Sequence, residues 1–203
     1  MNDDLRQMIA NDEKIMWEGK PNKKCYIFES IFNPLMPFAL IWAIIDFGII
    51  GINYSSQSQE EMLFFLIPFF ALHLMPVWLY LGGVLVCRKK YNNTYYIVTD
   101  KAIYVSQGVI AKMIQTKPFA EMSHIDLHRG FFDQMFNVGD IVCTSSQHSI
   151  NGTADIINIS SVSDYTNVLN IIKKLQQDIY SDIMYPNDKR PQENHGYNTK
   201  YKG

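Results

Sequence analysis

Residues 31–52 read IFNPLMPFALIWAIIDFGIIGI, a run of 22 residues whose only charged side chain is Asp46. Residues 62–87 form a second apolar run, MLFFLIPFFALHLMPVWLYLGGVLVC, which contains no Asp, Glu, Lys or Arg. Because a helix rises about 1.5 Å per residue, each run is long enough to cross a hydrocarbon core of roughly 30 Å. We therefore expect a two-helix transmembrane hairpin. The alternative, a soluble protein with two buried core helices, rarely produces apolar runs of this length.

The charged residues around the two runs predict the orientation of the hairpin. Residues 53–61, between the runs, contain no Lys or Arg, whereas basic residues gather before the first run and after the second. By the positive-inside rule, both termini then lie in the cytoplasm and the chain is a multi-pass membrane protein. These basic residues would meet anionic lipid headgroups without selecting one lipid. They are Lys20, Lys23, Lys24, Arg88, Lys89 and Lys90.

Polar residues inside the runs are the first candidates for function. Asp46 and His73 lie where a charge is costly and tends to mark a functional position, and antiparallel neighbouring helices would let them meet. One interpretation is a satisfied interhelical hydrogen bond that orients the hairpin. The other is a proton-linked path or an oligomer contact. Pro68 and Pro76 fall inside the second run and predict a bent helix, whereas Pro34 and Pro37 mark the start of the first.

After the second run the pattern becomes that of a folded domain, residues 91–180. Short apolar stretches with period-two alternation, separated by turn signals such as Asn151-Gly152, predict antiparallel strands. A helix follows, capped by Ser163, with apolar side chains at spacings of three and four on one face. This order indicates an α+β fold, a small barrel or sandwich closed at one end by the helix. The expected strands are residues 94–99, 102–107, 109–119, 122–128, 140–145 and 155–160.

The two ends of the chain are polar. Residues 1–29 form an N-terminal segment with a short helix expected over residues 4–16, and residues 30–87 hold the hairpin with its flanks. The tail, residues 184–203, is rich in Asn, Lys and Pro, and we expect it to be disordered.

Several stretches resemble bacterial membrane proteins that carry a pleckstrin-homology-like (PH-like) domain. They are WEGKP at residues 17–21, YYIVTDKAIYVSQGVI at residues 95–110, the run from residue 123 that ends FNVGDIVCTS, and residues 159–175. The sequence departs from the family where Lys101-Ala102 stands in place of a frequent Lys-Arg pair. The resemblance implies seven strands and a capping helix, and a domain that binds or assembles rather than catalyses. Fold analogy alone does not establish a function.

The remaining sequence gives little sign of catalysis. It has no GxSxG, HExxH, P-loop or GxGxxG motif, so we expect no enzyme activity and no cofactor. The formal net charge of −2 gives no reason to expect nucleic acid as a partner. A phosphoinositide site at the hairpin loop, residues 106–108, is disfavoured because Lys101, Lys112 and Lys117 are scattered around it rather than clustered.

A polar strand face is the second candidate site. His124, Asp126 and His128 would share one face of a strand, with Ile125 and Leu127 toward the core. Residues four apart on a strand lie roughly 13 Å from each other by rise alone, so all three cannot reach one metal ion. We therefore expect no metal site there and interpret the face, extended by Arg129, as a contact surface.

Together these observations predict a non-enzymatic, membrane-anchored PH-like scaffold at the cytoplasmic face of a bacterial plasma membrane. Its expected partners are the bilayer and either copies of itself or another membrane protein. The alternative function is an oligomeric transport or channel-associated subunit that uses the pair Asp46 and His73.

Overall fold

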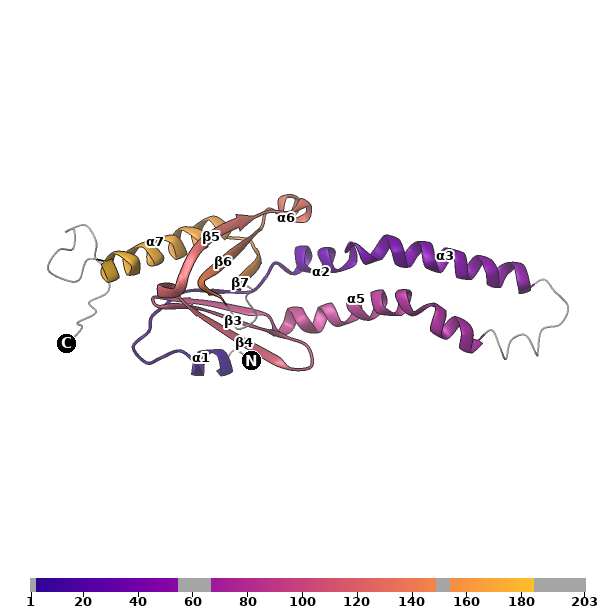
Figure 1. Ribbon diagram of the computed structural model, residues 1–203, viewed down its shortest axis with the longest axis horizontal. Coiled ribbons are helices and arrows are strands. Elements are labelled where there is room, and N and C mark those ends of the chain that lie inside the picture. The colour runs from indigo at the N-terminus through magenta and orange to yellow at the C-terminus, as the bar shows by residue number, and fades with distance from the viewer. Residues whose placement is uncertain (1–2, 55–66, 149–153, 185–203) are drawn as a thin grey trace. The chain divides into compact units, whose positions relative to one another are not determined.

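The computed structural model describes residues 3–54, 67–148 and 154–184 (Figure 1). It divides into two compact units, one of Met1–Tyr26 with Lys90–Gly203 and one of Ile27–Lys89. The expected loop after residue 54, the Asn151-Gly152 turn and the tail after residue 184 lie outside the described residues.

The first unit contains two antiparallel sheets and a long C-terminal helix. The four-stranded sheet has the order β1-β2-β3-β4, and the three-stranded sheet has the order β5-β6-β7. The strands are β1 (Ile15–Gly19), β2 (Tyr95–Thr99), β3 (Ala102–Gly108), β4 (Lys112–Pro118), β5 (Met122–His128), β6 (Gly139–His148) and β7 (Ala154–Val162). This is a mixed helical and antiparallel fold, as expected. The sheets remain separate, so the domain is not a closed barrel.

Strands β2 and β3 are buried on both faces, which explains why their sequence is almost continuously apolar. Tyr96 and Val98 belong to the main core between the sheets. Their neighbour Ile97 points to the other face, where Leu5 from the short helix α1 (Asp3–Gln7) and Tyr104 cover it. The N-terminal segment therefore supplies a second layer over the four-stranded sheet.

Strand β1 was not expected from the sequence, which predicted a helix over residues 4–16. Its residues pair antiparallel with β2, with Trp17 opposite Val98 and Gly19 opposite Tyr96. The Trp17 ring lies over Gly19, where a Cβ atom would come within 2.5 Å of the ring, so the Trp-Glu-Gly sequence suits this edge strand. As a result, the whole second unit is inserted between two strands that pair with each other.

The helix α7 (Tyr165–Met184) covers the main core, as predicted. Val168, Ile172 and Leu175 are buried in that core. Ser163 is not the N-cap residue of α7, because the helix begins at Tyr165 and Ser163 lies two residues before it. The Ser163 hydroxyl instead accepts a hydrogen bond from the Asn22 side-chain amide at 3.2 Å. The short helix α6 (Phe131–Phe136) occupies the stretch FFDQMF.

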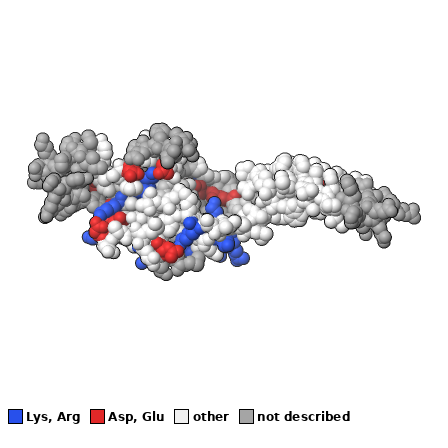
Figure 2. Space-filling model, turned by 60° about the horizontal axis from the view of Figure 1, so that its bottom comes forward, with Lys and Arg blue, Asp and Glu red and all other residues white. Residues whose placement is uncertain are grey.

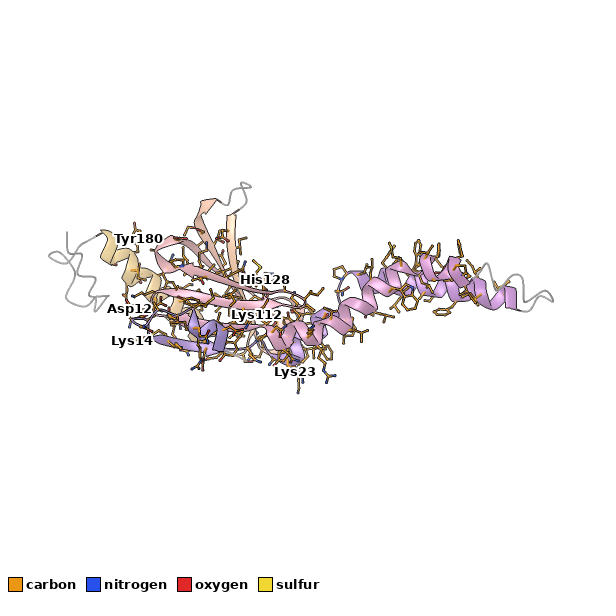
Figure 3. All side chains as sticks on the ribbon, turned by 90° about the horizontal axis from the view of Figure 1, so that it is seen from below. Asp12, Lys14, Lys23, Lys112, His128 and Tyr180 are labelled. Atoms are coloured by element: carbon orange, nitrogen blue, oxygen red, sulfur yellow. The ribbon has the colours of Figure 1, made fainter. Side chains whose placement is uncertain are left out.

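The second unit is helical and apolar. It contains most of α2 (Lys23–Ile31), then α3 (Leu35–Tyr54), the helical segment Ile67–His73 and most of α5 (Met75–Asn93). Large apolar side chains of α3 are exposed and project from the helix (Figure 3). Among the described residues, Leu35–Ile52 is the one straight helix long and apolar enough to cross a membrane.

The second apolar run is bent rather than straight. Ile67–His73 and Met75–Asn93 meet at 60°, and only the pair taken together could form a second span. Pro76 lies just after the break and has no N–H to donate to the carbonyl of Leu72, so the ladder is interrupted there. The predicted bend is confirmed, but a hairpin of two membrane-crossing helices is not established by the fold.

Truncation of Trp17 tests whether β1 belongs to the domain. We expect Trp17→Ala to reduce the free energy of unfolding by about 2 kcal/mol, less than for a fully buried Trp because this ring is only partly buried. Met16→Ala, at an exposed neighbour, should change it by less than about 0.5 kcal/mol. Urea unfolding of the detergent-solubilised full chain, followed by near-ultraviolet circular dichroism, measures both. Equal effects at the two positions would contradict this account of β1.

Candidate functional site

The second unit brings Asp46 and His73 into direct contact. The Asp46 carboxylate is fully buried, and its two oxygens lie 2.9 and 3.1 Å from Nδ1 of His73. The Trp42 indole donates to the His73 carbonyl oxygen at 2.7 Å. The imidazole stacks between the rings of Trp42 and Phe69, at centroid distances of 5.2 and 5.1 Å. The side chains of Trp42 and Phe69 therefore hold the imidazole in place against the Asp46 carboxylate.

This pair joins α3 to the segment Ile67–His73 at its last residue. Another hydrogen bond within the unit runs from the Tyr80 hydroxyl to the Ile31 carbonyl at 3.0 Å. Both oxygens of the buried Asp46 carboxylate lie within hydrogen-bond distance of the one Nδ1 atom of His73. This geometry matches a contact that clamps the two helices together.

The basic residues of the flanks are exposed. Lys20, Lys23 and Lys24 belong to the first unit, as does Lys90, whereas Arg88 and Lys89 belong to the second. In the first unit the rings of Tyr26 and Tyr91 lie 6.0 Å apart. The chain therefore leaves this unit and returns to it at one place, with basic residues on both sides of that place.

The strand β5 presents the expected polar face. His124, Asp126 and His128 are exposed along it, while Ile125 packs against the core. Leu127 is 40% exposed and so faces the core only in part. Among the described residues, His124, Asp126 and His128 do not form a group whose ligand atoms all lie within 4.8 Å of one another.

Arg129 was predicted to extend this face, but the structure gives it other contacts. Its Nε donates to the Val138 carbonyl at 2.8 Å, and its second guanidinium nitrogen lies 3.3 Å from Oδ1 of Asn137. The guanidinium also lies 4.6 Å from the centre of the Tyr165 ring. Arg129 therefore fastens the turn after α6 to the start of α7, and the candidate contact surface loses this member.

A cluster that the sequence analysis missed lies at the end of β5. Ligand atoms of His128, Asp133 and Asp140 lie within 4.8 Å of one another. The sequence offered no signal for it, because the register of β5 with β6 and the fold of α6 bring the three together. Both carboxylates already accept main-chain N–H groups, Asp133 from Gly130 at 2.8 Å and Asp140 from Ser161 at 2.6 Å.

The electrostatics of this cluster centre on Asp140. Burial raises the pKa of its carboxyl, and the neighbouring Asp133 raises it further, while the Ser161 amide and His128 act in the opposite direction. The three side chains offer ligand atoms for one small cation. The hydrogen bonds of the two carboxylates to the main chain also hold α6 and the β6–β7 ladder in place.

The lysines of the β2–β3 turn and of strand β4 form ion pairs with carboxylates. Lys101 contacts Asp12 at 2.5 Å, Lys112 contacts Asp4 at 2.8 Å, and the buried Lys117 pairs with Asp155. Figure 2 shows basic and acidic side chains next to one another on this face. The N-terminal segment thus removes much of the positive charge that an inositol phosphate would need, which adds to the argument against such a site.

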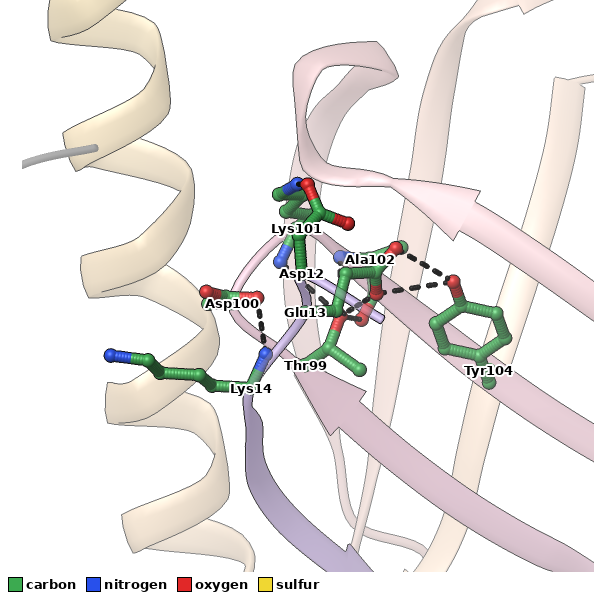
Figure 4. Close-up of polar contacts among 8 residues, drawn as sticks. All are labelled: Asp12, Glu13, Lys14, Thr99, Asp100, Lys101, Ala102 and Tyr104. Carbon is green, nitrogen blue, oxygen red and sulfur yellow. Dashed lines mark hydrogen bonds and ion pairs between the residues drawn. The ribbon is translucent and has the colours of Figure 1, made fainter. Parts of the chain in front are cut away.

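The same segment is bonded to the Asp100-Lys101 turn (Figure 4). The Lys14 amide donates to Asp100 at 2.9 Å, and the hydroxyls of Thr99 and Tyr104 donate to the Glu13 carboxylate at 2.7 and 3.1 Å. Burial, with Glu13 as the next cause, raises the pKa of Tyr104 to about 12. The Thr-Asp-Lys sequence is therefore a docking point for the N-terminal segment.

Sequence comparison agrees with this architecture. The family model described as Bacterial PH domain matches residues 38–176, more than half of the 203 residues. The chain belongs to the bacterial PH domain family. The match to the bacterial PH domain begins inside α3 and ends inside α7, so it covers most of the first apolar run and all of the second, and β1 precedes it. No curated protein and no solved structure matches the chain.

Asp140 in the bacterial PH domain should make stability depend on pH. Because its pKa is raised on folding, the folded state binds the proton more tightly, and this contribution to stability is lost as pH rises above about 4. Asp140→Asn keeps an oxygen for the Ser161 amide and removes the charge. The variant should therefore gain stability relative to the parent chain between pH 4 and pH 7.

Urea midpoints at both pH values measure this shift, with Asp126→Asn as an exposed control on the adjacent strand. A difference between parent and Asp140→Asn that stays constant from pH 4 to pH 7 would refute it.

Removal of one member of the Asp46–His73 pair should cost more than removal of both. His73→Leu leaves a buried carboxylate without its partner, which typically costs about 3 kcal/mol or more. The double variant Asp46→Leu/His73→Leu leaves no buried charge and should recover a large part of that loss. Unfolding of the full chain by titration with a denaturing detergent gives both values. Losses that simply add would show that the two side chains are energetically independent.

Proposed function

We propose that this protein is a membrane-anchored PH-like scaffold at the cytoplasmic face of the bacterial plasma membrane. The apolar unit anchors the chain, and the domain binds copies of itself or another membrane protein. The protein acts by assembly, without catalysis or a cofactor. The bilayer contributes its apolar interior and its anionic headgroups.

The observation that carries this proposal is the insertion of the apolar unit between β1 and β2. Gly19 and Tyr96 are register partners, so the chain leaves and re-enters the domain within the width of one ladder. If α3 crosses a bilayer, the chain must cross back before β2 begins. The strand pairing thus supports an even number of crossings, with both sides of the insertion in the same compartment, independently of the positive-inside rule.

Surface chemistry of α3 supports the anchor. Ile44, Phe47 and Ile52 are 71%, 63% and 77% exposed, respectively. Each Å² of apolar surface transferred out of water contributes about 25 cal/mol. A helix that is apolar all round and covered by little protein is stabilised by lipid rather than by water.

An anchored domain is suited to assembly because tethering raises the effective concentration of its surfaces. In the described part of the chain, strand β5 pairs only with β6, and it presents His124, Asp126 and His128 to the outside. Edge strands of this kind can accept a strand from a partner. The polar groups that could have suggested catalysis, such as Glu13 and Asp133, are instead bonded to the fold.

The alternative function is transport through an oligomer lined by Asp46 and His73. The buried contact between them is the observation in its favour. The double stacking of the imidazole and the use of both carboxylate oxygens favour the clamp. A scaffold tolerates Asp46→Asn if the helices still associate, whereas a proton-linked path would lose its flux.

Cysteine crosslinking in membranes tests the proposed function. We expect the full chain to remain with the membrane fraction after an alkaline wash. In those membranes Asp126→Cys on β5 should form a crosslink to a second copy or to a partner. Lys174→Cys, on the exposed side of α7, is the matched control and should give much less product.

The parent cysteines are buried and provide the background. A chain that washes off the membrane would contradict the anchor. A monomeric, uncrosslinked chain in both membranes and mild detergent would contradict the scaffold.

A further inference from the structure

The first unit contains a polar cavity of about 320 Å³ where the two sheets separate. One wall comes from the four-stranded sheet and the residues just before it, and the other from strand β7. The cavity has the size of a small-ligand site. Its polar lining includes Lys90, Thr94, Gln107, Gln115, Asn158 and Ser160.

The β7 wall is the edge strand of the three-stranded sheet. The Ser160 amide donates to the Tyr96 hydroxyl at 3.1 Å, across the gap between the sheets. The next amide, that of Ser161, points the other way and donates to Asp140 on β6. Because main-chain directions alternate along a strand, the amide of Asn158 points to the same side as that of Ser160. The Ser160 N–H is bonded to Tyr96, so the main-chain N–H of Asn158 is the one that faces the cavity together with side-chain amides.

The lining is rich in hydrogen-bond donors and contains one cation. No Asp or Glu lines the cavity. Among the described residues Lys90 makes no ion pair, in contrast to Lys101, Lys112 and Lys117, which are all paired with carboxylates. Gln107 donates to Gln115 at 3.4 Å, which leaves the Gln115 amide N–H groups available. One lysine and several neutral donors form a site for an anion.

We propose that this cavity binds a phosphate ester. Its volume accommodates a phosphate with a short polyol such as glycerol, and its donors match the non-bridging phosphate oxygens. Lys90 follows the second apolar run by three residues, so the headgroup of an anionic phospholipid is one source of this ester. That source rests on the proposed membrane anchor. A soluble phosphate ester is the other source, and it needs no anchor.

Titration of the full chain in neutral detergent with glycerol 1-phosphate tests the site. We expect saturable chemical-shift changes in the side-chain amides of Gln107, Gln115 and Asn158, followed by nitrogen-15 NMR. Lys90→Gln should weaken binding at least tenfold. Lys89→Gln makes the same charge change at a neighbour outside the cavity and should weaken it less than twofold.

A second matched pair controls for folding. Asn158→Asp places a carboxylate in the cavity and should abolish binding, whereas Asn170→Asp on exposed α7 should leave it intact. No saturable shift with glycerol 1-phosphate would overturn the proposal. Equal losses for Lys89→Gln and Lys90→Gln would also overturn it, because the effect would then be a general attraction of charge.

Lipid nanodiscs separate the two sources of the ester. If the headgroup is the ligand, the cavity amides shift in phosphatidylglycerol discs without added ester and do not shift in phosphatidylcholine discs. If they respond only to soluble ester, the phosphate site is supported and the lipid source is excluded. Failure of the membrane anchor leaves the detergent titration unchanged, so the two proposals fail separately.

Discussion

The pairing of β1 with β2 is the constraint on which the rest of this structure depends. It joins residues on opposite sides of a long apolar insertion and fixes the points where the chain leaves and re-enters the domain. Without β1, the edge of β2 would be open and the Trp17 ring would lose its contact with the core. A ladder across an insertion requires that the insertion begin and end side by side. That requirement couples the fold of the bacterial PH domain to the path of its apolar unit.

Acidic and basic side chains of the first unit lie in different places relative to this strand pairing. The N-terminal segment that leads into β1 carries Asp4, Asp12 and Glu13, which bind the lysines and hydroxyls of the first hairpin. Exposed basic residues flank the place where the apolar unit is inserted, and Lys90 borders the polar cavity between the sheets. These ion pairs neutralise the lysines of the β2–β3 turn and of β4, while positive charge remains near the proposed membrane surface. A headgroup site would then be expected beside the insertion rather than at the hairpin loop.

Local patterns in the sequence predicted much of the fold, and long-range contacts account for what they missed. The almost continuously apolar stretches of β2 and β3, the spacing in α7 and the bend near Pro76 all follow from neighbouring residues. Strand β1 could not be predicted in this way, because its partner lies beyond the insertion and its five residues carry too short a pattern. The same reason explains why the cluster of His128, Asp133 and Asp140 was missed. Arg129 was misread as a surface charge because its partners, Val138 and the Tyr165 ring, are set by the fold. The contact of Asp46 with His73 was anticipated because both were unusual in apolar runs.

Hydrogen exchange of the full chain in lipid or mild detergent addresses the central pairing most directly. The amides of β1 that bond to β2 should exchange slowly and should lose protection together with those of β2, since both belong to one ladder. Exchange of the β1 amides at the rate of an unstructured peptide, with β2 still protected, would show that the N-terminal strand is not part of the domain and that the insertion argument fails.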